Sequence, residues 1–240
     1  CATAIRLNPV SVSEGLVVAG DDRVYWFFGD VVEILAGDLL SLGFVDITST
    51  PISVAATESG FVTVERVVDR DGITTNTLIS YGPDGSPLWS TPVASLGRDL
   101  VVDNGEAFLS GLPGDPGTGS VLRIDLTTQV ITEVAVAEPT RVVPLGDGYA
   151  MLRRGFDLGT SQILGIRLFD DLLQEQTEVT VTALALGETR GFDWTGVSVD
   201  GQLIVGGESA GLPFGDGTFG LSGAFVMSVD PSLVNGPNLT

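Results

Sequence analysis

A short pattern centred on glycine recurs five times along the chain: a small or polar residue, the glycine, and then an apolar run. β-Branched residues precede each glycine, and successive glycines are 45, 45, 43 and 53 residues apart. Because glycine adopts the positive φ that tight hairpin turns need, each instance predicts two strands joined by a short turn. The five glycines are Gly15, Gly60, Gly105, Gly148 and Gly201.

Two further strands follow in most of these repeats. The third strand alternates apolar residues with others and runs into a turn, at residues 78–81, 121–124, 164–168 and 225–229. A fourth strand follows at residues 87–89, 130–134 and 177–181. Units of about 40 to 50 residues with four antiparallel strands are typical of the blades of a β-propeller. A β-sandwich is the alternative fold.

The repeats predict an all-β chain that forms one domain over residues 1–240. We expect a five-bladed β-propeller in which residues 2–8 complete the last blade by pairing beside the strand at 225–229, because residues 233–240 offer no fourth strand and an open ring would leave strand edges unpaired. Residues 31–43 fit a short helix as well as strands, and we favour strands. The expected blades cover approximately 9–50, 51–94, 95–138, 139–186, and 187–232 with 2–8.

The composition narrows the possible functions. The chain carries a net charge of -20, with 11 arginines, no lysine and no histidine. It therefore lacks the side chains for Ser-His, Cys-His or Ser-Lys catalysis, and its charge disfavours nucleic acid. The hydrophobic content of 43% excludes a disordered acidic tail. Its one cysteine excludes an internal disulfide and a cysteine-rich zinc site.

Carboxylate chemistry remains open as an alternative. Asp99 and Asp193, with Arg141 in support, could act at a central channel as the acid and base of a carbohydrate-active enzyme. The segment 69–72 (Asp-Arg-Asp-Gly) has the opening of a calcium loop but lacks the later ligands, so a hairpin turn is the better interpretation. We predict that the protein is not an enzyme and has no cofactor and no metal site.

Aromatic side chains suggest packing and docking surfaces. Four aromatic residues stand in a row at 25–28, so alternation must turn two of them away from either face of a strand. We expect neighbouring blades to cover them, and we expect Trp89 and Trp194 to pack between blades. The loop at 207–223 is the longest one predicted, and we predict that it docks a partner. Its apolar docking residues are Pro213, Phe214 and Phe219.

Two resemblances point to a bacterial envelope protein. Cys1, followed by Ala2 and Thr3, resembles the start of a mature bacterial lipoprotein, in which the cysteine carries acyl chains. The repeat at 195–231 is similar to the propeller repeats of bacterial surface proteins: its residues 196–207 read Gly-Val-Ser-Val-Asp-Gly-Gln-Leu-Ile-Val-Gly-Gly. These resemblances imply lipid attachment at Cys1 and an extracytoplasmic location, in the periplasm or on the cell surface. They also imply a recognition or scaffolding role.

From the sequence we therefore expect a lipid-anchored, extracytoplasmic scaffold or protein-binding subunit of a larger membrane or envelope complex. Its expected partners are other protein subunits and, through the acyl chains on Cys1, a membrane; nucleic acid is not expected. One alternative is a module that binds a glycan or a small molecule. The other is the carbohydrate-active enzyme described above.

Overall fold

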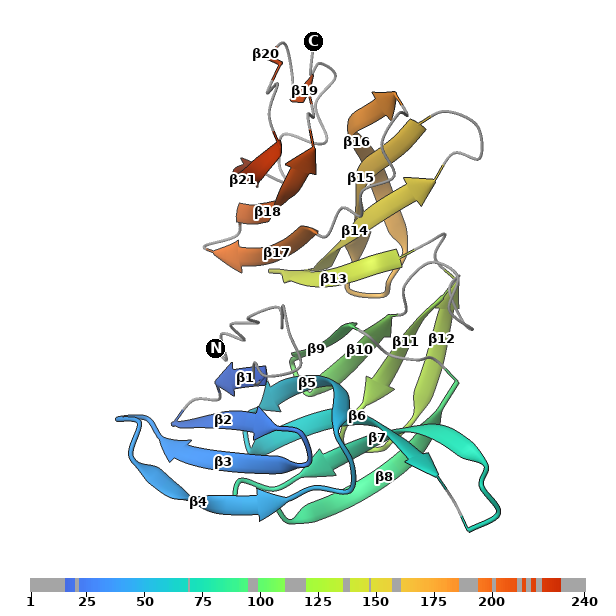
Figure 1. Cartoon of the computed structure of the whole chain (residues 1–240). Coiled ribbons are helices and arrows are strands. Elements are labelled where there is room, and N and C mark those ends of the chain that lie inside the picture. Colours follow the sequence, from blue (N-terminus) through green and yellow to red (C-terminus); the bar gives the residue numbers. More distant parts are fainter. Residues whose placement is uncertain are drawn as a thin grey trace. The chain divides into compact units, whose positions relative to one another are not determined.

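A computed structural model describes most of the chain, and every regular element in the described part is a strand (Figure 1). The chain divides into two compact units, Cys1–Glu133 and Val134–Thr240. The described part of the chain contains no helix that is long and apolar enough to cross a membrane. The described residues are 16–19, 22–68, 70–94, 99–110, 120–135, 139–146, 148–156, 161–185, 194–199, 202–210, 213–214, 217–218 and 222–229.

The first unit contains three sheets of four antiparallel strands, each arranged in chain order. The first sheet comprises β1 (Leu16–Ala19), β2 (Arg23–Phe28), β3 (Val31–Ala36) and β4 (Ser41–Asp46). The second comprises β5 (Pro51–Thr57), β6 (Gly60–Val68), β7 (Thr74–Tyr81) and β8 (Pro87–Val93). The third comprises β9 (Asp99–Asp103), β10 (Glu106–Ser110), β11 (Ser120–Asp125) and β12 (Ile131–Ala135). The first strands are neighbours, because β5 lies beside both β1 and β9.

The second unit repeats this arrangement. A four-stranded sheet comprises β13 (Pro139–Leu145), β14 (Gly148–Phe156), β15 (Ser161–Asp170) and β16 (Glu175–Ala185). A three-stranded sheet comprises β17 (Trp194–Val199), β18 (Gln202–Ala210) and β21 (Ser222–Val229), and its first strand lies beside β13. A two-stranded hairpin comprises β19 (Pro213–Phe214) and β20 (Gly217–Thr218).

The predicted all-β architecture of four-stranded antiparallel sheets is confirmed. Residues 31–43 also form strands, as favoured: β3 ends at Ala36 and β4 begins at Ser41. The last sheet has three strands within the described residues. Residues 2–8, which we expect to complete that sheet, and residues 233–240 lie outside the described part of the chain.

The hairpin glycines hold their places for two different reasons. Gly105 has a φ of +78° and follows Asn104 at +48°, so this turn needs the positive φ that the sequence predicts. Gly148 has no positive φ. A glycine is needed there because the backbone of Phe169 approaches closely. A Cβ atom there would lie 2.2 Å from the carbonyl oxygen of Phe169. Gly15 and Gly201 lie outside the described residues.

The second sheet contributes to two hydrophobic cores, one on each of its faces. On one side its Phe61 packs with aromatic rings of the first sheet, at 4.8 Å between ring centroids from Tyr25 and 5.3 Å from Phe27. On the other side Val62 and Val64 join a core with third-sheet residues, which are Leu100, Ala107, Leu109, Leu122 and Ile124. Every residue of β6 from Gly60 to Glu65 is therefore buried, because the two faces of this part of the strand are both covered.

A buried carboxylate links the first two sheets. Glu65 of β6 is fully buried and accepts hydrogen bonds from Thr63 Oγ1 (2.7 Å) and the Tyr81 hydroxyl (2.8 Å). It also accepts bonds from the backbone N–H (2.8 Å) and the hydroxyl (3.3 Å) of Ser49. Ser49 belongs to the connection between β4 and β5, so Glu65 fixes the path of the chain from one sheet to the next. A buried charge survives only when it is hydrogen-bonded in this way.

This environment predicts a loss of stability at alkaline pH. Burial, opposed by a bond from Thr48 and reinforced by Glu65, raises the pKa of Tyr81 to about 12. In the unfolded chain the Tyr81 hydroxyl loses its proton near pH 10, whereas in the folded chain it still keeps the proton at that pH. The stabilisation is therefore complete below pH 10 and is lost between pH 10 and 12, at a cost of at most about 3 kcal/mol. The free energy of unfolding, measured with urea at several pH values in this range, should fall more steeply with pH for the wild type than for Tyr81→Phe. Equal slopes would contradict the assignment.

Candidate interaction surface

The first sheet exposes aromatic side chains on one of its faces. Its second strand, β2, buries Tyr25 and Phe27 against the second sheet, whereas Trp26 and Phe28 point away and are exposed. The corresponding strand of the second sheet, β6, is buried on both faces from Gly60 to Glu65. Our expectation that neighbouring blades cover the whole row at 25–28 is therefore wrong for two of its four residues.

The exposed face continues onto the outermost strand of the sheet. Strand pairing places Trp26 opposite Glu33, and Glu33 opposite Phe44, in one row across β2, β3 and β4. Phe44 is 66% exposed and Leu42, on the same strand, is 56% exposed. Trp26 and Phe28 contact each other, with ring centroids 4.6 Å apart. We call these four residues, Trp26, Phe28, Leu42 and Phe44, the first-sheet surface.

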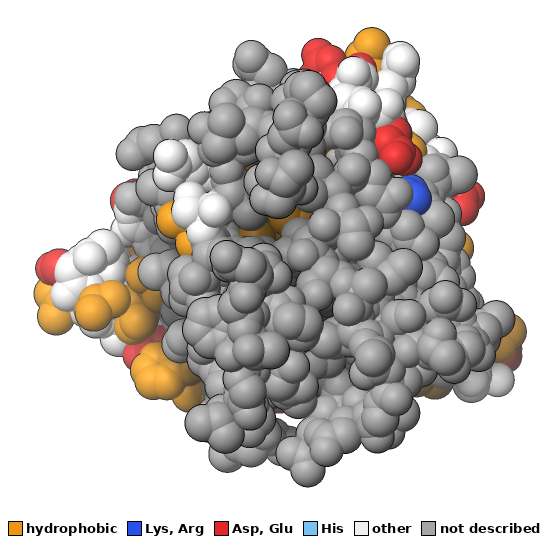
Figure 2. Space-filling model, turned by 90° about the horizontal axis from the view of Figure 1, so that it is seen from above, with side chains coloured by type: hydrophobic (Ala, Val, Ile, Leu, Met, Phe, Trp, Pro, Cys, Tyr) orange, Lys and Arg blue, Asp and Glu red, His pale blue; other side chains and the backbone are white. Residues whose placement is uncertain are grey.

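The turn between β3 and β4 extends this apolar area. Leu39 has a φ of +67°, a conformation that costs a non-glycine residue roughly 1–2 kcal/mol. The turn is closed by bonds from Leu39 N to Ala36 O (2.8 Å) and from Ala36 N to Leu40 O (2.9 Å). Leu39 and Leu40 are both exposed at its tip. Figure 2 shows hydrophobic side chains gathered at the left of the view, the side on which this hairpin ends in Figure 1.

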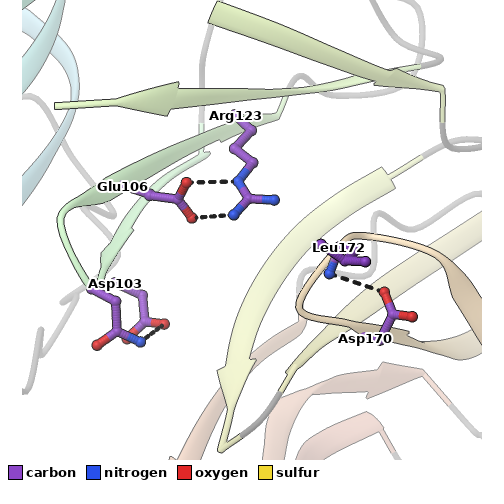
Figure 3. A network of polar contacts seen from close by, with 6 residues as sticks. Asp103, Glu106, Arg123, Asp170 and Leu172 are labelled. Atoms are coloured by element: carbon purple, nitrogen blue, oxygen red, sulfur yellow. Dashed lines mark hydrogen bonds and ion pairs between the residues drawn. The ribbon is translucent and has the colours of Figure 1, made fainter. Parts of the chain in front are cut away.

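The acidic residues seen in Figure 3 serve structural roles. Glu106 and Arg123 form a bidentate pair across β10 and β11, with contacts of 2.8 and 2.7 Å. Asp170 caps the turn after β15 by accepting bonds from Leu172 N (3.0 Å) and Gln174 N (2.8 Å). Each of these carboxylates is already bound to groups of the chain itself.

Asp103 is the acid with the most unusual environment in this region. Burial, reinforced by the nearby Glu106 carboxylate and opposed by a bond from Asn104 Nδ2 (3.0 Å), raises its pKa above the usual range for aspartate. A raised pKa and one carboxylate neighbour alone do not make a catalytic site, because Glu106 is held by Arg123. Within the described ranges no group of three or more acidic, histidine or cysteine side chains could hold a metal ion.

The structure describes only some of the residues singled out from the sequence. Asp99 and Arg141 are both buried, on β9 and β13. Pro213 and Phe214 form the two residues of β19. Trp89 packs, partly buried, against the core of the second and third sheets, as predicted. The residues outside the described part are Cys1, Asp69, Asp193 and Phe219.

Two features of the first two sheets, the burial of Glu65 and the exposure of apolar residues on β4, are not among the sequence predictions. Glu65 follows an alternating run and looks like the solvent-facing residue of an ordinary strand. Its burial depends on the first sheet covering that face of β6. The exposed apolar residues of β4 also had a sequence signal, since Leu39, Leu40, Leu42 and Phe44 lie within six positions of one another.

Comparison with known proteins identifies a fold. No family model matches the sequence, and no curated protein sequence matches it. Among solved structures, the Pan2 WD40 domain of Neurospora crassa matches 94% of this chain and 64% of its own, with a TM-score of 0.56 and 10% identity. WD40 domains are β-propellers, so this likeness and the four-stranded antiparallel sheets place the chain among the β-propeller folds.

Two other solved structures are similar at lower TM-scores. Kluyvelomyces marxianus Hsv2 matches 78% of this chain and 58% of its own, with 16% identity and a TM-score of 0.47. BamB from Moraxella catarrhalis matches 86% of each chain, with 12% identity and a TM-score of 0.36. The chain thus spans 58% and 64% of the lengths of Hsv2 and the Pan2 domain.

Proposed function

We propose that this chain is a non-enzymatic scaffold that binds other proteins. The observation that carries the proposal is the first-sheet surface, in which three aromatic side chains and one leucine are exposed on a sheet whose opposite face is firmly packed. Exposed apolar side chains gathered on a rigid element are a usual feature of protein-binding surfaces. The engaged carboxylates beside β10 and β15 support a non-catalytic role.

The proposal includes the expected architecture and location. Five blades form a ring in a single domain, and residues 2–8 complete the last blade beside β21. Acyl chains on Cys1 hold the protein at a membrane outside the cytoplasm, as a subunit of an envelope complex. The loop at 207–223, with Pro213, Phe214 and Phe219, contributes a further partner contact. The mass of the N-terminal peptide from native membranes tests the anchor, and an unmodified Cys1 would contradict it.

The absence of lysine allows a sharp test of partner binding. A carbodiimide joins carboxylates to primary amines, and this chain has 31 acidic residues but no lysine side chain to react within itself. Acid-to-lysine links formed by these acidic residues must therefore reach a lysine outside the 240 residues of this chain. We expect mass spectrometry to find such links repeatedly with the same partner, and purified chain alone to give none. Native samples that give no links above those of an unrelated acidic protein would contradict the scaffold role.

A further inference from the structure

We infer that the outer edge of the first sheet binds an extended, positively charged segment of a partner protein, which adds as a new strand beside β4. This inference rests on the proposed scaffold function and specifies the binding surface and the chemistry of the partner. It follows from three properties of β4: an open edge, exposed apolar side chains, and a surrounding stretch of sequence whose charged residues are all acidic.

The edge of β4 is open within the described part of the chain. β4 is the last strand of its sheet, and β3 is its one hydrogen-bonded neighbour there. Its pairing is regular from Gly43 to Asp46, because the bulge in this ladder lies opposite Leu35, near the start of the strand. The outward N–H and C=O groups of a regular edge strand are a template for another strand.

The other outermost strands of the first unit carry features that discourage such pairing. β8 contains Pro87 and Pro92, which lack the N–H group that a new strand would need. β12 exposes Thr132 and Glu133 in its centre. By contrast, β4 has neither proline nor a charged residue between Ser41 and Val45, and it exposes Leu42 and Phe44. Natural edge strands are usually protected by proline, charge or a bulge; in β4 the bulge lies near the start, so the edge from Gly43 to Val45 is consistent with a binding role.

The charges around β4 determine which partner fits. The stretch from Val24 to Glu65 contains no arginine or lysine, whereas Asp30, Glu33, Asp38 and Asp46 lie on or beside β3 and β4. The arginine that begins β2, Arg23, donates to the carbonyl oxygen of Pro83 in the turn between β7 and β8. A second copy of this chain, with its charge of -20, would be repelled, and so would an anionic lipid surface. A segment with lysine or arginine beside apolar residues is complementary.

Strand geometry fixes the pattern of the partner segment. Phe44 and Asp46 alternate along the regularly paired part of β4 and therefore share one face of the sheet, and Leu42 is the bulge residue that precedes this part. A segment added beside β4 would place its alternate side chains on this face. Apolar side chains would contact Leu42 and Phe44, and a cationic one would pair with Asp46. Backbone hydrogen bonds would supply affinity, and these side chains would supply specificity.

Synthetic peptides and the full chain test this inference. The probe is an extended peptide with valine, phenylalanine and arginine on one face and threonine on the other, and fluorescence anisotropy measures its binding. We expect saturable binding that is about tenfold weaker for Phe44→Thr and Leu42→Thr. Leu88→Thr is the matched control, because Leu88 is a 59% exposed leucine on the outermost strand of the second sheet. Its binding should equal that of the wild type.

Two modified peptides separate the parts of the inference. Replacing arginine by glutamate should weaken binding at least about tenfold if the acidic surrounding selects the partner. Methylating alternate backbone nitrogens along one edge should abolish binding if the peptide pairs as a strand. Binding that survives methylation, or that Leu88→Thr weakens as much as Phe44→Thr does, would overturn the inference, as would a lack of saturable binding.

Other occupants of this edge would give different results. A concentration-dependent dimer that Phe44→Thr disrupts would identify a second copy. Binding to phosphatidylcholine vesicles that the same change removes would identify a bilayer. A lower Tm for Phe44→Thr would indicate that the chain itself covers the edge. Each result would overturn the inference, whereas native cross-links confined to residues 207–223 would refute this edge and still support the scaffold function.

Discussion

Replacing Glu65 by alanine should lower the free energy of unfolding by about 4 kcal/mol, because two buried donor groups and one part-buried donor would lose their acceptor at once. Thr63 Oγ1, the Tyr81 hydroxyl and the Ser49 backbone N–H now bind this carboxylate at 2.7–2.8 Å. A buried donor without a partner costs about 1–3 kcal/mol. Thermal unfolding followed by tryptophan fluorescence should show a Tm lower by about 10 °C.

Two milder variants control for the loss of side-chain volume. Glu65→Gln keeps one acceptor oxygen but turns an NH₂ group toward donors on the other side, so we expect about half the loss. Tyr81→Phe removes one donor and nothing of the carboxylate, and it should cost about 1 kcal/mol. If Glu65→Ala were as stable as Tyr81→Phe, the carboxylate would not organise the connection between the first two sheets.

Replacing Gly60 by alanine should destabilise the protein by about 3 kcal/mol or more, the range of severe backbone strain. Gly60 has a φ of +150°, and an added Cβ would lie 2.1 Å from the carbonyl oxygen of Tyr81. It would also lie 2.8 Å from the carbonyl carbon of Gly82, so the end of β7 would have to move away from β6. Urea unfolding of the full chain measures this loss.

Gly105 provides the matched control for this substitution. It also has a positive φ, of +78°, but an added Cβ would meet nothing within 4 Å. Gly105→Ala should therefore cost only the conformational strain, about 1 kcal/mol. Gly148→Ala should resemble Gly60→Ala, because its Cβ would lie 2.2 Å from the carbonyl oxygen of Phe169. Equal losses at Gly60 and Gly105 would show that contact with the neighbouring strand is unimportant.

The strands could be predicted because their signals are local. Alternation of apolar residues and the glycine at each hairpin are both contained within a few positions, and β6, β7 and β14 lie where these signals place them. The reason for each glycine was harder to predict. Gly105 and Gly148 look alike in the sequence. Gly105 is needed for its positive φ, whereas Gly148 is needed because β15 approaches its backbone closely.

The exposure of the β2 aromatic residues could not be predicted, because burial depends on neighbours distant in the sequence. Trp26 and Phe27 are adjacent and both aromatic, and the sequence does not say which of them faces the second sheet. The burial of Glu65 could not be predicted for the same reason. This acid looks exposed in the sequence, but it is buried and bonded to Thr63 on its own strand and to the distant Tyr81 and Ser49.

The two-sided burial of β6 has a thermodynamic consequence for the first unit. Phe61 belongs to the core with the first sheet, and Val62 belongs to the core with the third sheet. Because both cores depend on an ordered β6, neither core can unfold while the other stays folded. The three sheets should consequently melt as one cooperative block, with local opening confined to the outermost strands. β4 can then exchange partners at its edge while the interior of the block stays closed.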